Sequence, residues 1–285
     1  MSRNFDHTIV SVQNLDTAAD AYRRLGFSVM PRSVHENLGT ANHIIQFHNN
    51  YFELLGDFHN YRDTLMRDLM SERFAGGDGL AMLSLNCTNI VGDRDRLGAS
   101  GYAPGVIHDS SRKVAFDDGR IDATASRSMI NWRDSKSRRW GSLFYTQHDK
   151  PETIWFAPWQ EHANSVYTLI GISYCSNDFI ADAQYISDMF CSATAEQCAD
   201  RMSWVTPRNE RLELLTPRGL SNRFVTPVPK APFGIWPVAL RYAVASLDKC
   251  KVALRSGDVP FEEKSGVVTV AAHHASGVLS EFCEL

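Results

Sequence analysis

The feature that most constrains the fold is a supersecondary unit that recurs four times along the 285 residues. Each unit opens with a strand, continues into a short helix and closes with an apolar strand. Opening strands are predicted over 5–12, 80–87, 169–174 and 237–244, and closing strands over 52–55, 142–147, 212–215 and 279–282. Because such a unit cannot bury its own sheet face, the units are expected to pair.

The first unit shows the order of its elements most clearly. Its helix is expected to end at Gly26, and strands are predicted over 27–30, 41–47 and 51–55. The order of elements in the first unit is therefore β-α-β-β-β. From its repetition we predict an α+β fold in which four βαβββ modules pair into two cup-shaped mixed sheets.

The pairing of modules divides the chain into two predicted domains. Domain 1 covers 1–157 and holds modules 1 and 2, and domain 2 covers 158–285 and holds modules 3 and 4. A helix is predicted over 61–74, and a stiff proline-rich linker over 227–232 separates modules 3 and 4. The polar, charged segment 108–140 predicts a long loop or hairpin at the rim of the first cup.

Several short motifs in this chain occur together in one known group of proteins. They are Asp6-His7, Leu25-Gly26-Phe27, Gly39 to His43, Tyr51 to Gly56, Gln147 to Glu152 with Trp155, and His162-Ala163-Asn164. With these motifs the chain resembles the vicinal oxygen chelate superfamily, and in particular its proteins with a glyoxalase-like domain, which more usually carry proline where Ala163 stands. The fold hosts lyases, isomerases, dioxygenases and binding proteins, so the resemblance alone leaves the activity open.

The resemblance implies a metal site inside the first cup. In the superfamily the metal ligands come from the first and last strands of paired units, and His7 and Glu53 match two of these positions. Imidazole and carboxylate ligands suit a divalent ion, Mn²⁺, Fe²⁺, Co²⁺, Ni²⁺ or Zn²⁺. A structural role is the alternative, with Glu53 paired to an arginine such as Arg3, because a buried carboxylate needs a partner.

Two ligands hold a metal weakly, so a third is expected. None of the positions equivalent to His7 in the other modules can ligate a hard cation: Met82, Gly171 and Ala239. The closing strand of module 2 offers His148, which we predict as the third ligand, and then Gln147. His148 and Glu53 are also the predicted catalytic residues, because either can move a proton.

His43 is a further candidate, and the direction of its side chain depends on the hairpin that follows it. A two-residue turn puts His43 on the face opposite Glu53, whereas a three-residue turn over 48–50 puts both on one face. The sequence leaves the roles of ligand, substrate contact and core histidine open for His43. His35 and His108 are interpreted as surface loop residues. The predicted substrate contacts are His43, Tyr145, Gln147, Trp155 and His162.

Charge limits the partners. The formal net charge is −4 and no long run of lysine or arginine is present, so neither nucleic acid nor an anionic membrane is expected as a partner. A small-molecule substrate is expected instead, and a homodimer is compatible with the sequence. The first residues run directly into a strand without the pattern of a signal peptide, so the expected location is the cytoplasm.

Two functions are compatible with these patterns. The first is a metal-dependent enzyme of lyase or isomerase type, acting on a small oxygenated metabolite that chelates the ion through vicinal oxygens. The alternative is a metal-free protein that binds or sequesters a small molecule. An extradiol-type dioxygenase is less favoured, because such enzymes typically take histidines from the second pair of units. The opening strands there carry none, and Glu213 and Glu281 with Arg241 predict a carboxylate-arginine pair instead.

Overall fold

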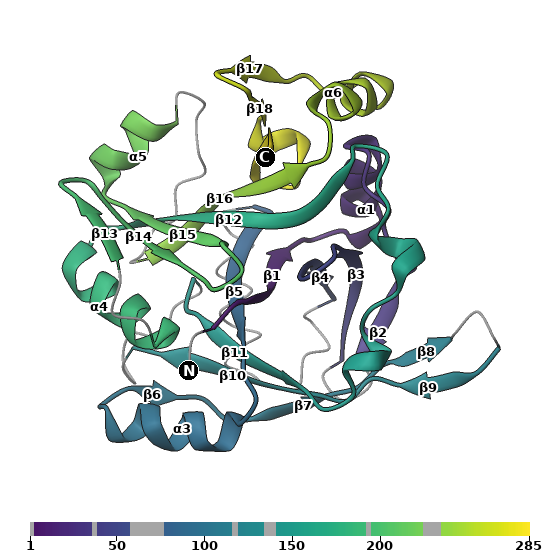
Figure 1. The fold of residues 1–285 in the computed structure, drawn as a ribbon. Helices are drawn as coiled ribbons and strands as arrows, with labels where there is room; N and C mark the ends of the chain where they lie inside the picture. The colour runs from purple at the N-terminus through teal and green to yellow at the C-terminus, as the bar shows by residue number, and fades with distance from the viewer. Residues whose placement is uncertain are drawn as a thin grey trace.

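The computed structural model describes residues 3–35, 39–57, 77–115, 119–133, 141–191, 195–224 and 235–285. Figure 1 shows two large sheets with helices around them and a hairpin that projects from the first sheet. The predicted helix over 61–74 and the predicted linker over 227–232 lie outside the described residues. In the part of the chain that the structure describes, no helix has the length and apolar character needed to cross a membrane.

The first sheet has nine strands within the described ranges. At its centre β1 (Phe5–Ser11) pairs antiparallel with β5 (Gly79–Asn86). Strand β4 (Tyr51–Gly56) runs parallel to β1, and β11 (Phe144–His148) runs parallel to β5, so the two halves repeat one arrangement. The other strands are β2 (Ser33–His35), β3 (Thr40–Gln46), β6 (Ala103–Pro104), β7 (His108–Ser110) and β10 (Ser126–Trp132).

The second sheet repeats the pattern with eight strands in the described part of the chain. Its central pair is β12 (Val166–Ser176) and β16 (Ile235–Val244), which run antiparallel. Strand β15 (Arg211–Leu215) is parallel to β12, and β19 (Leu279–Glu284) is parallel to β16. The outer strands are β13 (Ala195–Cys198), β14 (Arg201–Val205), β17 (Glu262–Lys264) and β18 (Val267–Val270).

One helix follows the opening strand of each module: α1 (Leu15–Arg24), α3 (Ile90–Ala99), α4 (Phe179–Phe190) and α6 (Leu247–Ser256). Local capping defines where α1 begins, because the Asn14 side chain accepts a hydrogen bond from the Thr17 backbone at 2.9 Å. Short elements complete the described fold: the hairpin β8 (Lys113–Ala115) and β9 (Ile121–Ala123), helix α5 (Pro217–Arg223), and the 3₁₀ turns Pro151–Thr153, Ala157–Gln160 and Ala272–His274.

This architecture confirms the predicted α+β fold of four βαβββ modules paired into two cup-shaped mixed sheets. One predicted strand is wrong. Residues 27–30 form no strand, and the second strand of module 1 is β2 (Ser33–His35). Phe27 and Val29 are buried in the core, and Met30 N donates to Ile44 O without a continuing ladder. The apolar run therefore reflects burial of an irregular segment.

The largest hydrophobic cluster of the described residues includes side chains from both sheets. The Phe27 ring lies 5.4 Å from the Tyr242 ring and 6.2 Å from the Phe282 ring, and Phe52 also contacts Tyr242. Aromatic contacts of this kind stabilise a core beyond the area that they bury. The first sheet ends at His148 and the second begins at Val166. The domain division at 157/158 falls between them and stays a prediction.

Candidate active site

The first sheet encloses a cavity of about 120 Å³. A cavity of this size has room for roughly ten water molecules or a ligand with a similar number of heavy atoms. Much of its lining is apolar, contributed by Ile9, Ile44, Met82, Ile130, Phe144 and Ile154. Its titratable lining residues are His7, His35, Glu53, His108, Arg112 and His148, with Tyr51 beside them. An apolar cavity with a few convergent polar groups is the usual form of a small-molecule site.

Strand alternation brings the three principal predicted residues into this cavity. His7 comes from β1, Glu53 from β4 and His148 from β11, and each shares its inward face with residues two positions away. The His7 ring stacks on the Tyr51 ring at 4.5 Å and meets the Phe144 ring edge-on at 5.1 Å. The imidazole of His7 is thus held in one orientation by packing.

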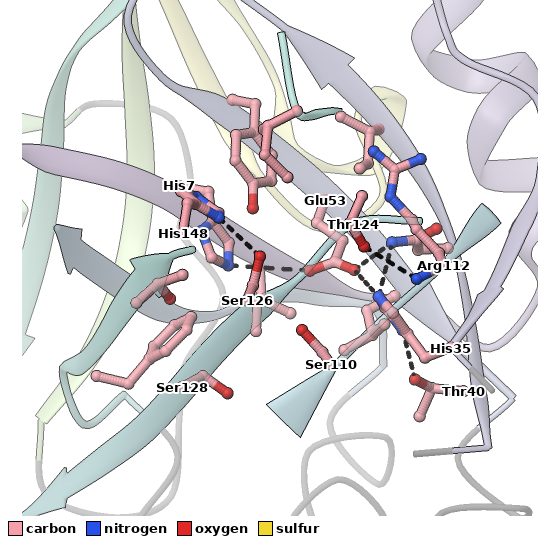
Figure 2. Close-up of a pocket in the computed structure, with 18 of the residues that line it drawn as sticks. His7, His35, Thr40, Glu53, Ser110, Arg112, Thr124, Ser126, Ser128 and His148 are labelled. Carbon is pink, nitrogen blue, oxygen red and sulfur yellow. Dashed lines mark hydrogen bonds and ion pairs between the residues drawn. The ribbon is translucent and has the colours of Figure 1, made fainter. Parts of the chain in front are cut away.

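The two carboxylate oxygens of Glu53 have different surroundings. Asn42 Nδ2 donates a hydrogen bond to Glu53 Oε1, and His35 Nε2 lies 3.6 Å from the same atom. Glu53 Oε2 faces His7 Nε2 at 4.0 Å and accepts no hydrogen bond from the described residues. Figure 2 shows Glu53 between His7 and His148 on one side and His35 and Arg112 on the other. One oxygen is therefore anchored, and the other is open to the cavity.

The structure corrects the interpretation of His35 as a surface loop residue. His35 lies in β2, its side chain is 14% exposed, and its Nδ1 is 2.9 Å from Thr40 Oγ1. Burial lowers the pKa of His35, although the nearby Glu53 carboxylate acts in the opposite direction. His35 is therefore a neutral imidazole at neutral pH, and Asn42 Nδ2 lies 3.3 Å from its Nε2.

Asp6 connects the two cavity histidines. Its Oδ1 atom lies 2.6 Å from His7 Nδ1 and 3.1 Å from His148 Nε2. The second nitrogen of His148, Nδ1, is 2.8 Å from Ser126 Oγ. The pairing of β1 with β5 shifts register between Phe5 and His7, so Asp6 does not follow simple alternation. The carboxylate fixes both imidazole rings from outside the cavity lining.

Opposing effects set the protonation of this cluster. Burial alone raises the pKa of the Asp6 carboxyl, but the imidazoles of His148 and His7 outweigh it and hold that pKa well below its usual range. Burial alone lowers the pKa of His148, but the Asp6 carboxylate outweighs it and the net shift of that pKa is upward. Both shifts favour the charged forms, a carboxylate at Asp6 and an imidazolium at His148.

The structure places His43 away from the cavity, which corrects its prediction as a substrate contact. In the β3–β4 pairing His43 stands opposite Leu54 and Ile44 stands opposite Glu53. The His43 side chain therefore points to the face of the sheet opposite to that of Glu53. Its Nδ1 is 2.8 Å from Met30 O. The hairpin closes with Phe47 N donating to Asn50 O, which selects the shorter of the two turns considered. His43 is therefore a core histidine bonded to a backbone carbonyl.

Tyr145 and Gln147 also point away from the cavity, which corrects their prediction as substrate contacts. The Tyr145 hydroxyl donates to Met189 O at 2.7 Å, and Gln147 Oε1 accepts from Ile90 N at 3.0 Å. Both alternate with His148 along a regular β11, so His148 needs no bulge to face the cavity.

His162 and Trp155 have supporting positions, so their prediction as substrate contacts is corrected as well. His162 Nε2 donates to Gln46 O at 2.8 Å, and its Nδ1 accepts from Ser28 N at 3.0 Å. Burial lowers the pKa of His162 to about 4. Trp155 lies behind Tyr51, with ring centroids 5.9 Å apart. Neither side chain lines the cavity.

Sequence reasoning misses Asp6 and Arg112 as residues of the site. Asp6 stands out in the sequence only as the neighbour of His7, because the register shift that turns it toward both histidines cannot be seen there. Arg112 lies between β7 and β8, inside the segment predicted to form the rim. That segment also forms the hairpin β8–β9. Its predicted position at the rim of the first cup is the one feature of the sequence that points to Arg112.

A family model described as a glyoxalase-like domain matches residues 5–188, more than half of the chain. The chain belongs to the glyoxalase-like domain family. The predicted resemblance to proteins with a glyoxalase-like domain is thereby confirmed. No curated protein matches this glyoxalase-like chain.

Solved structures share the fold of this glyoxalase-like protein at low sequence identity. A hypothetical protein from Staphylococcus aureus has a TM-score of 0.69 and 11% identity, with 99% of each chain covered. A mutant of 4-hydroxymandelate synthase from Streptomyces coelicolor has a TM-score of 0.58 and 10% identity, with 99% of this chain and 92% of that chain covered. A xylose isomerase-like TIM barrel/4-hydroxyphenylpyruvate dioxygenase fusion protein has a TM-score of 0.57 and 9% identity, and the match covers all of this chain and 49% of that one. These likenesses show the fold alone.

The ligand set implied for this glyoxalase-like protein is His7, Glu53 and His148. Among the described residues no group of three or more His, Cys, Asp or Glu side chains is arranged to hold a metal ion. His7 Nε2 and Glu53 Oε2 are open donors, but both nitrogens of His148 contact other groups, Asp6 and Ser126. A tightly bound ion of the Zn²⁺ type takes at least three protein ligands. The donor set as it lies does not fit such an ion.

The second cup of the glyoxalase-like protein contains charged pairs. Glu281 receives two hydrogen bonds from Arg223, at 2.7 and 2.8 Å, and another from Arg241 at 3.0 Å. Glu213 accepts from Ser173 Oγ at 2.5 Å and lies 3.4 Å from Arg223. The predicted pair between Arg241 and Glu281 is confirmed, and Arg223 adds a second cation that the sequence analysis misses. The carboxylates of this cup are therefore held by arginines.

Proposed function

We propose that this protein is an enzyme of lyase or isomerase type that moves a proton on a small oxygenated molecule bound in the first cup. The observation that carries the proposal is the placement of Glu53 Oε2, which faces His7 Nε2 at 4.0 Å while Asn42 holds the other carboxylate oxygen. Both atoms are proton acceptors in a largely buried cavity. A ligand between the two atoms can therefore meet a base on one side and an acid on the other.

The chemistry assigned to the pair has two steps. Glu53 removes a proton from a carbon next to a carbonyl group, and the His7 imidazole in its protonated form returns a proton to a leaving oxygen or to a neighbouring carbon. The first outcome is an elimination and the second is an isomerisation. Asp6 supports His7 by accepting a hydrogen bond from its Nδ1, which directs Nε2 into the cavity.

Proton exchange with a panel of candidate compounds tests this proposal. Wild-type protein is incubated in D₂O with hydroxy-ketones, 2-oxo acids and 2-hydroxy acids, and loss of the C–H signal is followed by NMR. We expect exchange or conversion of at least one compound, and Glu53→Gln should slow it by roughly 10²- to 10⁴-fold. The exposed Glu262→Gln is the matched control. Equal rates in Glu53→Gln and wild type contradict the assignment of Glu53.

A divalent metal, Mn²⁺, Fe²⁺, Co²⁺, Ni²⁺ or Zn²⁺, is a second candidate component of the site. The observation that favours it is the Asp6 contact, because metal-ligating histidines usually donate their other N–H to a carboxylate. His7 and Glu53 supply two donors, and His148 becomes a third only by giving up its contact with Ser126 or with Asp6. Elemental analysis of wild type, His7→Ala and Glu53→Ala tests this metal site. Stoichiometric metal in wild type that both variants lack supports the site, whereas wild type that retains no metal after each ion is added contradicts it.

A metal-free binding protein of the same fold is separated from an enzyme by the exchange experiment. A binder shifts the signals of a bound compound without exchanging or converting it. An extradiol-type dioxygenase has less support, because Glu213 and Glu281 of the second cup are occupied by arginines and serine.

A further inference from the structure

Arg112 is a buried cation on the wall of the first cavity. Its side chain lines the cavity and the residue is 8% exposed. Its backbone is fixed by two bonds to Thr124, since Arg112 N donates to Thr124 Oγ1 at 2.9 Å and Thr124 N donates to Arg112 O at 2.9 Å. Figure 2 shows Arg112 on the side of Glu53 away from His7. The main chain of Arg112 is therefore fixed next to the hairpin β8–β9.

The guanidinium of Arg112 has no protein partner within the described ranges. Its Nη2 atom is buried and makes no hydrogen bond there, and no carboxylate of those residues lies within 4.0 Å of the side chain. The buried Arg3, in contrast, bonds Asp93 Oδ1 and Asn86 O. Burial lowers the pKa of Arg112, and the nearby Tyr51 and Glu53 only partly oppose this effect. A buried unpaired charge is costly, which makes an incoming anion favourable.

Glu53 does not satisfy Arg112, although both line one cavity. The nearest groups on Glu53 are Asn42, His35 and His7, so its carboxylate is already positioned for proton transfer. The cavity thus separates one negative and one positive group without a direct ion pair between them. A ligand that places an anion at Arg112 leaves Glu53 Oε2 free to act as a base.

Hydroxyl groups add donors that suit an anion. Ser110 and Ser128 line the same cavity, and no side-chain hydrogen bond joins either hydroxyl to another described residue. Figure 2 shows Ser110 and Ser128 below Glu53 in that view. The guanidinium of Arg112 offers donors that match the two oxygens of a carboxylate, which binds guanidinium groups in a bidentate, planar manner.

We propose that Arg112 is the anchor for the carboxylate of the substrate, which is a short hydroxy- or oxo-monocarboxylic acid. This inference rests on the proposed function, because it places the reacting carbon of that acid between Arg112 and the pair formed by Glu53 and His7. The cavity of about 120 Å³ has room for an acid with a short chain.

Lactate and lactamide test the anchor by binding, because they differ in the carboxylate alone. Titration calorimetry is done with wild type, Arg112→Gln, Arg112→Lys and the control Arg94→Gln, whose side chain is 45% exposed. We expect lactate to bind wild type at least about tenfold more tightly than lactamide, and this preference to vanish in Arg112→Gln. Arg112→Lys should keep part of it, and Arg94→Gln all of it. Equal binding of the two compounds to wild type, or unchanged lactate affinity in Arg112→Gln, overturns the proposal.

Thermal unfolding shows whether Arg112 has only a structural role. Removal of an unpaired buried charge should leave the melting temperature of ligand-free Arg112→Gln equal to or above that of wild type. Lactate should raise the melting temperature of wild type and not of Arg112→Gln. A lower melting temperature of the ligand-free variant means that the protein itself pairs with Arg112, and overturns the anchor.

The anchor and the catalytic proposal fail in different ways. If lactate binding depends on Arg112 and persists in Glu53→Gln, while wild type exchanges no proton in any compound of the panel, the anchor stands and the proton transfer is wrong. If neutral hydroxy-ketones exchange equally in wild type and Arg112→Gln, and lactate has no preference over lactamide, the proton transfer stands and the anchor is wrong.

Discussion

Asp6 Oδ1 lies 3.1 Å from His148 Nε2, although 142 positions separate the two residues in the chain. Asp6 belongs to the opening strand of module 1 and His148 to the closing strand of module 2. Their contact is possible because β1 and β5 pair antiparallel at the centre of the first sheet and β11 lies beside β5. The pairing of two modules therefore assembles the charged cluster as well as the cavity.

Replacement of Asp6 by asparagine should reduce turnover more than substrate binding. Asp6 is absent from the cavity lining, so KM should change little. Loss of the acceptor for His7 Nδ1 leaves that ring without its fixed orientation, and kcat should fall by roughly 10- to 100-fold. Steady-state kinetics on the compound found by proton exchange measures both constants, with the exposed Asp95→Asn as control. A rise in KM at unchanged kcat contradicts this role.

His162 should make the stability of the protein depend on pH. Its pKa is lowered by burial to about 4 from an ordinary value near 6.5, so the unfolded chain binds a proton between these values and the folded chain does not. The contribution of His162 is complete above about pH 6.5 and is lost as the pH falls toward 4, by up to roughly 3 kcal/mol. Urea unfolding of wild type and His162→Gln across this range should show a steeper loss in wild type. The exposed His273→Gln should follow wild type, and parallel curves for all three proteins contradict the prediction.

Strand alternation and the repeat are sufficient to predict the residues on regular strands. His7, Glu53 and His148 follow period-two alternation, so the sequence places them in the same cup. The direction of His43 depends on one residue of turn length, which propensities do not determine. Residues 27–30 are apolar enough for a strand, but their burial among the rings of the shared core produces the same pattern.

Asp6 and Arg112, the two site residues that the sequence does not reveal, lie where the alternation of strand side chains is interrupted. The register shift next to Asp6 turns its carboxylate toward two histidines, and no local pattern in the sequence specifies that shift. Arg112 reaches the cavity from an irregular segment between two short strands. Its burial depends on the hairpin β8–β9 folding back through Thr124, which is a tertiary contact. Sites assembled from such segments are found only when the fold is known.

Arg223 should be important for stability and unimportant for proton exchange. It joins Glu281 at 2.7 Å and Glu213 at 3.4 Å in the second cup, and Arg223→Met leaves Glu213 without its cation. We expect a loss of about 3 kcal/mol in the free energy of unfolding, because removal of one partner of a buried ion pair leaves the other charge buried without compensation. The double variant Arg223→Met/Glu281→Gln should lose less than the sum of the single variants. Denaturant unfolding tests both, and Arg218→Met, with a 73% exposed side chain, should change stability little. An additive double variant contradicts the coupling.

Gly257 should be essential to the close packing of α6 against the end of α1. It caps α6, and a Cβ atom at this position would lie 1.8 Å from Arg24 O at the end of α1. A backbone oxygen cannot move aside as a flexible side chain can, so Gly257→Ala should force the ends of α1 and α6 apart and destabilise the fold by at least about 1 to 3 kcal/mol. Gly98→Ala is the matched control in α3, where no atom lies within 4 Å of the new Cβ. That change should stabilise the protein by roughly 0.5 to 1 kcal/mol, because alanine loses less conformational entropy than glycine in a helix. Thermal or urea unfolding of the two variants therefore gives shifts of opposite sign, and a stabilising Gly257→Ala contradicts the close approach of α1 to α6.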